Sequence, residues 1–290
     1  MTLAQALQQS AYVLSANGIE DSHIDARMLL GRAANLSPVQ IYTEPEQTLS
    51  REEKDKLQKL IRRRLQHEPT AYILKHKEFY GIDFYVDSRV LIPRPETEIL
   101  VDAALKFAGS RRYLTGPLLV ADIGTGCGAI AISLALNLPG SKVYATDLSS
   151  SALEVAKLNC ENHKVTEQVT LLSGNLLQPL PEPVDLILAN LPYIKNSELP
   201  SLSPEIAKFE PRMALDGGRN GLDYIRQLLE QVKEQINTGG CLLLEIGRNQ
   251  EKDVSRLIHS CLNRVNIEYI EDLNGIKRVV KIELYTQFDK

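Results

Sequence analysis

Apolar positions in the first quarter of the chain recur at helical spacing. One face is formed by four residues at intervals of three or four positions: Leu3, Leu7, Ala11 and Leu14. Further apolar groups follow capping residues, such as Ser37 before Pro38 and Ser50 three positions before Glu53. Residues 1–75 are therefore predicted to form a small helical bundle that recognises a partner, because no group of residues in it suggests chemistry.

The next segment connects two domains. Residues 76–92 are rich in aromatic and β-branched residues and predict a β-hairpin linker, with Asp87 and Ser88 in its turn. Two prolines follow in Pro93-Arg94-Pro95-Glu96-Thr97-Glu98, and they prevent a helix from starting before Pro95. This segment is either a capped entry to a helix or, if it has a function, a cover over the mouth of a cofactor site.

From residue 93 onward, strand-like runs alternate with helical runs. Seven segments of strand length are predicted to be strands, at 118–123, 142–146, 169–172, 184–189, 240–246, 266–271 and 277–284. Helical patterns lie between them, and Thr238-Gly239-Gly240 is expected to separate a helix over 222–237 from the strand that follows. The alternation predicts an α/β fold, with a seven-stranded Rossmann-like domain over residues 93–290.

Composition narrows the class of protein. At 290 residues and 43% apolar content, the chain fits one large or two modest globular domains. No run approaches the roughly 18 apolar residues of a membrane span, and the start resembles no secretory signal. We therefore expect no membrane contact. The four cysteines and five histidines are dispersed, so we also expect a reduced cytoplasmic protein without a metal site.

Charge argues weakly against a nucleic-acid partner. The net charge is −4, whereas stable binding of nucleic acid needs a basic field, so we expect no such binding. One basic run, Arg62-Arg63-Arg64, is interpreted as a solvated helix face. Contact of this run with RNA or with an acidic partner is the alternative.

A glycine loop follows the first strand of the sheet and precedes a helix. The loop is Gly124-Thr125-Gly126-Cys127-Gly128, and its glycines let the backbone approach a ligand closely. Asp147, about 20 residues further on at the end of the second strand, is placed to hold two ribose hydroxyls. Asn175 and Leu176 follow the third strand, where they would contact the edge and face of an adenine. The loop fits a dinucleotide as well as S-adenosylmethionine, so by itself it leaves the cofactor open.

The tetrapeptide Asn190-Leu191-Pro192-Tyr193 follows the fourth strand, at the sheet edge where ligands bind in such folds. The Asn190 side-chain oxygen and the Leu191 carbonyl are two acceptors. Pro192 stiffens the turn, and the Tyr193 ring can stack on a planar group. Together they suit a planar –NH2 group, which an N-methyltransferase must hold and a hydride transferase need not. The pattern therefore favours S-adenosylmethionine, and an ordinary strand-to-loop turn is the alternative for the tetrapeptide alone.

A set of short segments spread along the chain forms a family pattern. They are Glu68-Pro69, Tyr72-Ile73-Leu74, Phe79-Tyr80-Gly81, Ile92 to Glu98, Gly124 to Gly128, Glu210-Pro211, Ala214-Leu215, Gly217-Gly218, Gly221-Leu222, Leu244-Glu245-Ile246-Gly247, Asp272-Leu273 with Gly275, and Arg278-Val279-Val280. With them, nearly the whole chain resembles the release factor glutamine N5-methyltransferases. Three positions depart from that family: Leu191 replaces a proline, Asn175 replaces an acid and Lys75 stands where glycine is common. Leu191 still supplies its carbonyl, whereas the neutral Asn175 is expected to weaken adenine binding.

The resemblance implies a class I methyltransferase that uses S-adenosyl-L-methionine. It implies methyl transfer to the side-chain amide nitrogen of the glutamine in the Gly-Gly-Gln motif of peptide chain release factors, by a cytoplasmic enzyme that we expect to be a monomer. Two alternatives stay open. One is an adenine N6-methyltransferase on rRNA, tRNA or DNA, since Asn-Leu-Pro-Tyr also occurs in rRNA adenine dimethyltransferases. The other is a catalytically inactive partner-binding module.

Overall fold

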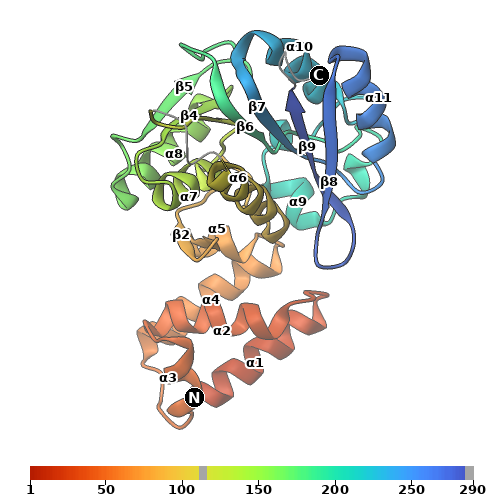
Figure 1. The fold of residues 1–290 in the computed structure, drawn as a ribbon. Helices are drawn as coiled ribbons and strands as arrows, with labels where there is room; N and C mark the ends of the chain where they lie inside the picture. Colours follow the sequence, from red (N-terminus) through yellow and green to blue (C-terminus); the bar gives the residue numbers. More distant parts are fainter. Residues whose placement is uncertain (111–115, 285–290) are drawn as a thin grey trace. The chain divides into compact units, whose positions relative to one another are not determined.

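The structure of the protein is a computed structural model, and it describes residues 1–110 and 116–284. The chain divides into two compact units, which are coloured along the sequence in Figure 1. Unit 1 comprises Met1–His76 together with Ser203–Phe209, and unit 2 comprises Lys77–Leu202 and Glu210–Lys290. The sequence pattern did not place Ser203–Phe209 with the N-terminal helices.

Unit 1 is built from helices, all but the last of which bury apolar side chains. They are α1 (Leu3–Ala16), α2 (Ser22–Ala34), α3 (Pro38–Thr43), α4 (Arg51–Leu65), α5 (Thr70–Leu74) and α9 (Pro204–Phe209). The predicted caps are present, because Ser37 Oγ accepts the Gln40 N–H and Ser50 Oγ accepts the Glu53 N–H. The Gln40 and Glu53 side chains return a bond to the cap N–H, which completes both capping boxes. Helices α1 to α5 contribute to an apolar core of this unit.

A buried ion-pair network joins four helices of unit 1. Arg64 of α4 is 3% exposed, and its Nε donates to Asp25 Oδ2 at 2.6 Å while its Nη2 donates to Glu205 of α9. Thr70 Oγ1 of α5 donates to the other Asp25 oxygen at 2.7 Å. The interpretation of Arg62–Arg64 as a solvated face is therefore wrong for Arg64. Its guanidinium is paired in the interior of the unit and attaches α9 to it.

A short hairpin begins unit 2, but its turn lies earlier than predicted. Strands β1 (Lys77–Phe79) and β2 (Ile82–Phe84) pair antiparallel, and Phe79 lies opposite Ile82. The two residues between them, Tyr80 and Gly81, have φ of 54° and 70°. Two successive positive φ angles make a tight two-residue turn that matches the strand twist. Asp87 instead holds Arg89 through its carboxylate, and residues 90–92 form no strand.

A seven-stranded sheet forms the body of unit 2. Its strands are β3 (Leu119–Ile123), β4 (Lys142–Asp147), β5 (Val169–Ser173), β6 (Val184–Ala189), β7 (Ile236–Glu245), β8 (Val265–Glu271) and β9 (Lys277–Leu284). The order is β5-β4-β3-β6-β7-β9-β8, with β9 antiparallel to both of its neighbours and the other pairs parallel. The predicted fold class is confirmed, and the predicted strands coincide closely with the observed ones except at the amino end of β7. Since successive strands leave β3 in opposite directions, the switch point between β3 and β6 is where a ligand is expected.

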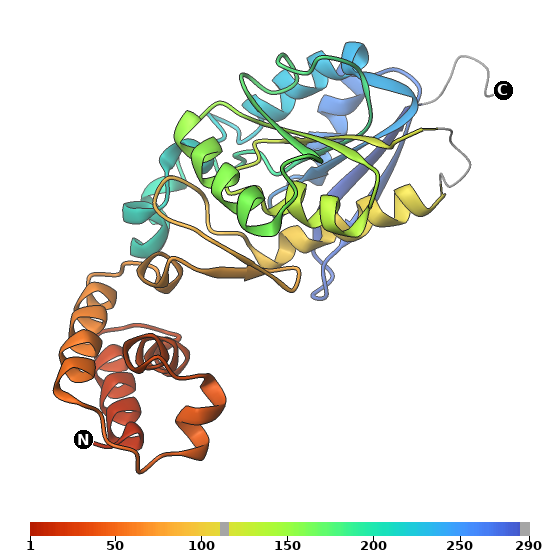
Figure 2. The ribbon, with the colours of Figure 1, turned by 90° about the vertical axis from the view of Figure 1, so that its left-hand side faces the viewer.

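Helices cover both faces of this sheet. They are α6 (Glu98–Ser110), α7 (Ala129–Asn137), α8 (Ser150–His163), α10 (Asp223–Gln235) and α11 (Glu251–Cys261). Asp122 of β3 accepts the N–H of Ala131 in α7, whereas its neighbours Ala121 and Ile123 belong to an apolar cluster with α10. Alternate strand residues face opposite sides, so α7 and α10 lie on opposite faces, as Figure 2 shows.

The strand β7 differs from its prediction at the amino end. It begins at Ile236, directly after α10, and Thr238-Gly239-Gly240 lie within it rather than separating a helix from a strand. Its pairing with β6 shifts register between Val184 and Leu186. A Cβ on Gly240 would lie 3.0 Å from the Asp185 carbonyl oxygen, so glycine permits the close approach of the two strands at this irregularity.

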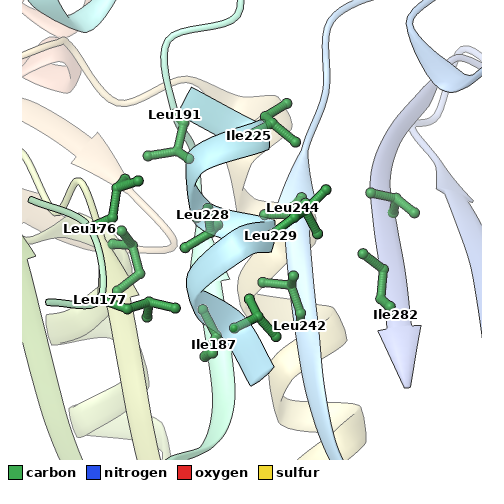
Figure 3. Close-up of a cluster of buried hydrophobic side chains, with 14 of the residues drawn as sticks. Leu176, Leu177, Ile187, Leu191, Ile225, Leu228, Leu229, Leu242, Leu244 and Ile282 are labelled. Carbon is green, nitrogen blue, oxygen red and sulfur yellow. The ribbon is translucent and has the colours of Figure 1, made fainter. Parts of the chain in front are cut away.

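An apolar cluster of unit 2 supports the switch point. Leu228 and Leu229 of α10 pack against Ile187 of β6 and Leu242 of β7 (Figure 3). Leu191, just beyond β6, joins the same cluster and is 5% exposed. Its side chain therefore anchors the start of the predicted site in the core. This leaves its backbone available for other contacts.

Candidate active site at the carboxyl ends of the central strands

A cavity lies at the switch point of unit 2. Its lining comes from the loops after β3, β4, β5 and β6, from the segment before α6, and from residues near α10. The predicted site residues that line it are Gly124, Gly126, Asp147, Asn175, Leu176, Asn190, Leu191 and Pro192. Those that do not line it are Thr125, Cys127, Gly128 and Tyr193. Sequence reasoning missed Arg89, Val90, Leu91, Pro211, Met213, Ala214 and Tyr224, which complete the wall with a few further residues.

The glycines of the loop after β3 have different tasks. Gly124, Gly126 and Gly128 all have positive φ, of 74°, 56° and 86°. A Cβ on Gly126 would meet no atom within 4 Å, so this residue leaves open space where the loop borders the cavity. A Cβ on Gly128 would lie 3.0 Å from Ile132 Cδ1, so this residue permits the packing of α7 instead. Gly126 is therefore the cradle position and Gly128 the packing position.

The two other loop residues turn into the protein. The Thr125 hydroxyl donates to Asp122 Oδ2 at 2.6 Å, and the Cys127 carbonyl accepts from Asn159 Nδ2 at 2.8 Å. Burial raises the pKa of the Cys127 thiol to about 12 and that of the Asp122 carboxyl to about 7. Thr125 and Cys127 thus support the loop from beneath, and their side chains make no part of the cavity wall.

Asp147 ends β4 and faces the cavity. Its Oδ2 accepts the Gly126 N–H at 2.9 Å and its Oδ1 accepts the Ser149 N–H at 2.8 Å. Burial raises its pKa, and the N–H groups of Ser149, Gly126 and Leu148 act in the opposite direction. Each carboxylate oxygen keeps a second lone pair, so Asp147 can accept from two hydroxyl groups of a ligand.

Asn175 and Leu176 follow β5 at the next edge of the cavity. Leu176 has a positive φ of 54°, and its carbonyl accepts from Thr146 Oγ1 at 2.9 Å. That bond ties the turn to the end of β4. The half-buried Asn175 side chain and the apolar Leu176 side chain therefore have fixed positions on the cavity wall.

Asn190 is held by a buried polar chain. Its Nδ2 donates to Thr97 Oγ1 at 3.0 Å, and the Thr97 hydroxyl donates to Glu245 Oε2 at 2.7 Å. The Tyr193 hydroxyl donates to Glu245 Oε1 at 3.3 Å. Burial raises the pKa of Glu245 to about 7, against the lowering effects of Thr97 and Tyr193. Sequence reasoning missed Thr97 and Glu245 as site residues, although a carboxyl directly after Leu242-Leu243-Leu244 was a readable signal.

A second chain segment braces the backbone of the tetrapeptide. Ile194 N–H donates to the Leu215 carbonyl at 3.1 Å, and Gly217 N–H donates to the Ile194 carbonyl at 2.8 Å. Gln250 Nε2 donates to the Tyr193 carbonyl at 3.0 Å. The loop beyond β6 is thus paired on both sides, so its position relative to the cavity is well defined.

The segment 93–98 differs from its functional interpretation as a cover. The cavity wall includes Arg89, Val90 and Leu91 but none of residues 93–98. Arg94 instead forms an ion pair with the buried Glu210 at 2.5 Å. Residues Pro95–Thr97 form a 3-10 turn ahead of α6, and Thr97 points at Asn190. The segment therefore contacts the tetrapeptide through Thr97 without lining the cavity.

Metal and membrane features are limited in the described part of the chain. Among residues 1–110 and 116–284, no group of three or more His, Cys, Asp and Glu side chains is arranged to hold a metal ion. In the same ranges, no helix has the length and apolar character that crossing a membrane requires.

Two family models match the N-terminal helices and the part of the chain that contains the predicted site. The family model described as the PrmC N-terminal domain matches residues 5–74. The model described as the Methyltransferase small domain matches residues 114–207, which include the glycine loop, Asp147 and the tetrapeptide.

Individual relatives extend these matches over nearly the whole chain. The release factor glutamine methyltransferase of Geobacter sulfurreducens is 38% identical over 280 residues, which cover 96% of this chain and 95% of the relative. The release factor glutamine methyltransferase of Moorella thermoacetica is 39% identical over 279 residues, with 96% and 97% covered. A methyltransferase from Pyrococcus furiosus superposes with a TM-score of 0.52 at 18% identity, over 72% of this chain and 92% of that one. This last likeness concerns the fold alone.

Proposed function

The chain belongs to the family of release factor glutamine methyltransferases, as its motifs predicted, and from this premise we propose its reaction and the roles of its residues. The reaction is transfer of a methyl group from S-adenosyl-L-methionine to the side-chain amide nitrogen of the glutamine in the Gly-Gly-Gln motif of peptide chain release factors. The observation that carries the proposal is that Asn190 lines the same cavity as Gly126 and Asp147.

The cavity residues fit the proposed cofactor. A Cβ on Gly126 would point into open space, which leaves room for a ligand against the loop, and Asp147 retains acceptor sites suited to ribose hydroxyls. Leu176 and Asn175 supply an apolar face and a polar edge for a planar base. When bound, S-adenosyl-L-methionine supplies a methyl group on a positively charged sulfur.

The tetrapeptide suits a planar amide. With its Nδ2 committed to Thr97, Asn190 has its Oδ1 available to accept an N–H from the glutamine side chain. The Leu191 carbonyl is the second proposed acceptor, Pro192 stiffens the turn, and the Tyr193 ring is proposed to lie against the amide plane. Leu191 therefore replaces the family's proline without loss of the group that binds.

The chemical task of these residues is orientation. An amide nitrogen is a poor nucleophile because its lone pair is delocalised into the carbonyl. Holding both N–H groups fixes the plane of the amide and the direction of approach, and such orientation contributes up to about 7–11 kcal/mol in the best cases. The methylated nitrogen loses its proton readily, so we assign no general base.

The same proposal assigns a role to unit 1, a cellular location and an oligomeric state. The helical bundle has its own core, and we assign it to recognition of the release factor. A substrate that acts in translation places the enzyme in the cytoplasm, which suits the free cysteines. We propose that the enzyme acts as a monomer.

The test is methyl transfer with radiolabelled cofactor. Wild-type protein is expected to label a release factor, and a release factor with Gly-Gly-Asn in place of Gly-Gly-Gln is expected to stay unlabelled. Asn190→Ala should abolish labelling while cofactor affinity stays nearly unchanged. Asn162→Ala, at an exposed position of α8, is the matched control and should behave as wild type. Labelling of rRNA, tRNA or DNA instead would favour the adenine alternative, and no labelling of any substrate would favour an inactive module.

A further inference from the structure

We infer that Thr97 and Glu245 are positioning residues, which together hold the Asn190 amide in the single orientation that presents its oxygen to the substrate. The inference deepens the proposed function and rests on it for the role of Asn190. Thr97 lies in the turn before α6, Asn190 follows β6, and Glu245 ends β7. The three side chains therefore come from segments far apart in the sequence.

The geometry forms one uninterrupted chain of hydrogen bonds. The bonds run from Asn190 Nδ2 to Thr97 Oγ1 at 3.0 Å and from Thr97 Oγ1 to Glu245 Oε2 at 2.7 Å. Thr97 is 4% exposed and Glu245 is 3% exposed. Bulk water therefore does not reach either side chain, so their polar atoms depend on one another and on neighbours such as Asn190 for hydrogen bonds.

A threonine hydroxyl has one hydrogen, and the position of that hydrogen sets the direction of every hydrogen bond in the series. An ionised Glu245 can only accept, so the Thr97 hydrogen must point to it. Thr97 then offers only a lone pair to Asn190, so the –NH2 end of the Asn190 amide must face Thr97. The opposite amide orientation would bring two acceptor oxygens together. An asparagine amide has nearly the same shape after a half turn, so without such a partner either end could face the substrate.

Protonation of Glu245 removes this constraint. A neutral carboxyl can donate to Thr97, whose hydrogen is then free to point at the Asn190 oxygen. Both amide orientations become satisfied, and only one of them presents an acceptor to the substrate. The rate is therefore expected to fall when Glu245 gains a proton.

The groups around Glu245 set the pH at which it gains a proton. Burial raises its pKa, the hydrogen bonds from Thr97 and Tyr193 and the charge of Arg278 lower it, and the charge of Glu96 raises it, with the result near 7. Thr97 and Glu96 come from the turn before α6, Tyr193 follows β6 and Arg278 lies on β9. These are the polar groups that act on Glu245 from the elements packed around it.

The first experiment compares variants of Thr97. Thr97→Val keeps the shape and removes the hydroxyl, whereas Thr97→Ser keeps the hydroxyl. Thr97→Val is expected to lower kcat about 10- to 100-fold, with the cofactor Kd within about twofold of wild type. Thr97→Ser is expected to restore most of the rate. Equal rates for all three proteins, with comparable unfolding curves, would overturn the inference.

The second experiment uses Glu245→Gln, which cannot ionise and can either accept from or donate to Thr97. Wild type should lose activity below a midpoint near pH 7. Glu245→Gln should show no such limb and should run at the low-pH level of wild type. An unchanged pH profile in Glu245→Gln would refute the assigned role.

A readout that needs no substrate separates this inference from the proposed function. The side-chain ¹⁵N–¹H signals of Asn190 can be identified by their loss in Asn190→Ala. We expect them to shift with a midpoint near pH 7 in wild type and to stay constant in Glu245→Gln. If these signals titrate while no glutamine is methylated, the proposed function fails and the orienting chain stands. If glutamine is methylated while the signals do not titrate, the orienting chain fails.

Discussion

A methyl group added at Gly217 tests whether the position of the tetrapeptide controls the reaction. An ideal Cβ on Gly217 would lie 2.6 Å from the Pro192 carbonyl oxygen, 2.8 Å from Tyr193 Cα and 2.9 Å from Gly221 Cα. All three are backbone atoms, so no side-chain rotation can relieve the contacts. Gly217→Ala therefore requires the loop that follows Asn190 to move.

The close contacts of the added Cβ give the expected loss of stability and of kcat. Overpacking of a well-packed site costs about 1–3 kcal/mol, and three backbone contacts below 3.0 Å place Gly217→Ala toward the upper end. The bond from Gly217 N–H to the Ile194 carbonyl, now 2.8 Å, would lengthen as the two segments separate. Since a displacement of about 1 Å at a reacting group can cost on the order of 100-fold in rate, kcat should fall by roughly 10- to 100-fold.

Gly109 in α6 provides a matched control. A Cβ there would meet no atom within 4 Å, and the residue lies in a helix, where alanine is favoured over glycine by up to about 1 kcal/mol. Urea unfolding followed by circular dichroism gives the free energy of unfolding, and labelled methyl transfer gives kcat. Gly109→Ala should match or exceed wild-type stability at wild-type activity. A Gly217→Ala protein as stable and as active as wild type would disprove the bracing argument.

Two further predictions concern the cofactor cavity and unit 1. Asp147→Ala removes a carboxylate that lines the cavity and should weaken cofactor binding by about 1.5–3 kcal/mol, measured by calorimetry; an unchanged Kd would remove Asp147 from the site. Asp25→Ala leaves the buried Arg64 with Glu205 as its remaining ion-pair partner and should destabilise unit 1 by about 3 kcal/mol in urea unfolding, whereas the exposed Asp21→Ala should change little. Asp25→Ala unfolding at the wild-type urea concentration would show that the network does not hold the unit together.

Local patterns were sufficient to predict most of the fold. Apolar runs marked the central strands β3, β6 and β7 because parallel strands buried on both faces contain few polar residues. The edge strand β8 instead alternates apolar and polar residues. Ser37 predicted a helix start because Pro38 follows it at the first helical position, and Ser50 did so because its capping partner Glu53 lies three residues further on. These signals depend on neighbours along the chain, which is why they can be read without the fold.

Predictions went wrong where distant segments determine the structure. The Arg62–Arg64 run has the composition of a solvated face, yet Arg64 is buried because Asp25 and Glu205 arrive from other helices to pair with it. The Thr238-Gly239-Gly240 run has the composition of a loop, yet it lies in β7 because β6 supplies a pairing partner across a register shift. In both cases the deciding interaction is tertiary.

The glycine loop shows the same limit within the site. The motif identifies five consecutive residues, Gly124 to Gly128, without distinguishing the ones that border the cavity from the ones that support the loop. The difference arises from backbone direction, because Thr125 and Cys127 face Asp122 and Asn159 while Gly124 and Gly126 face the cavity. Spacing alone carries no information on that direction.

Position along a buried strand separates structural acids from those that act on the site. Asp185 lies near the start of β6, and its two oxygens accept from the Leu119 N–H and from Asn237 Nδ2, far from the cavity. Glu245 is the last residue of β7, and its oxygens accept from the hydroxyls of Thr97 and Tyr193, the first of which in turn accepts from Asn190 of the cavity wall. Ligands bind beyond the carboxyl ends of parallel strands, so only an acid at that end can reach the groups that hold them. A lone carboxyl at the end of an apolar strand therefore predicts a residue that positions the site, and this test could have identified Glu245 from the sequence.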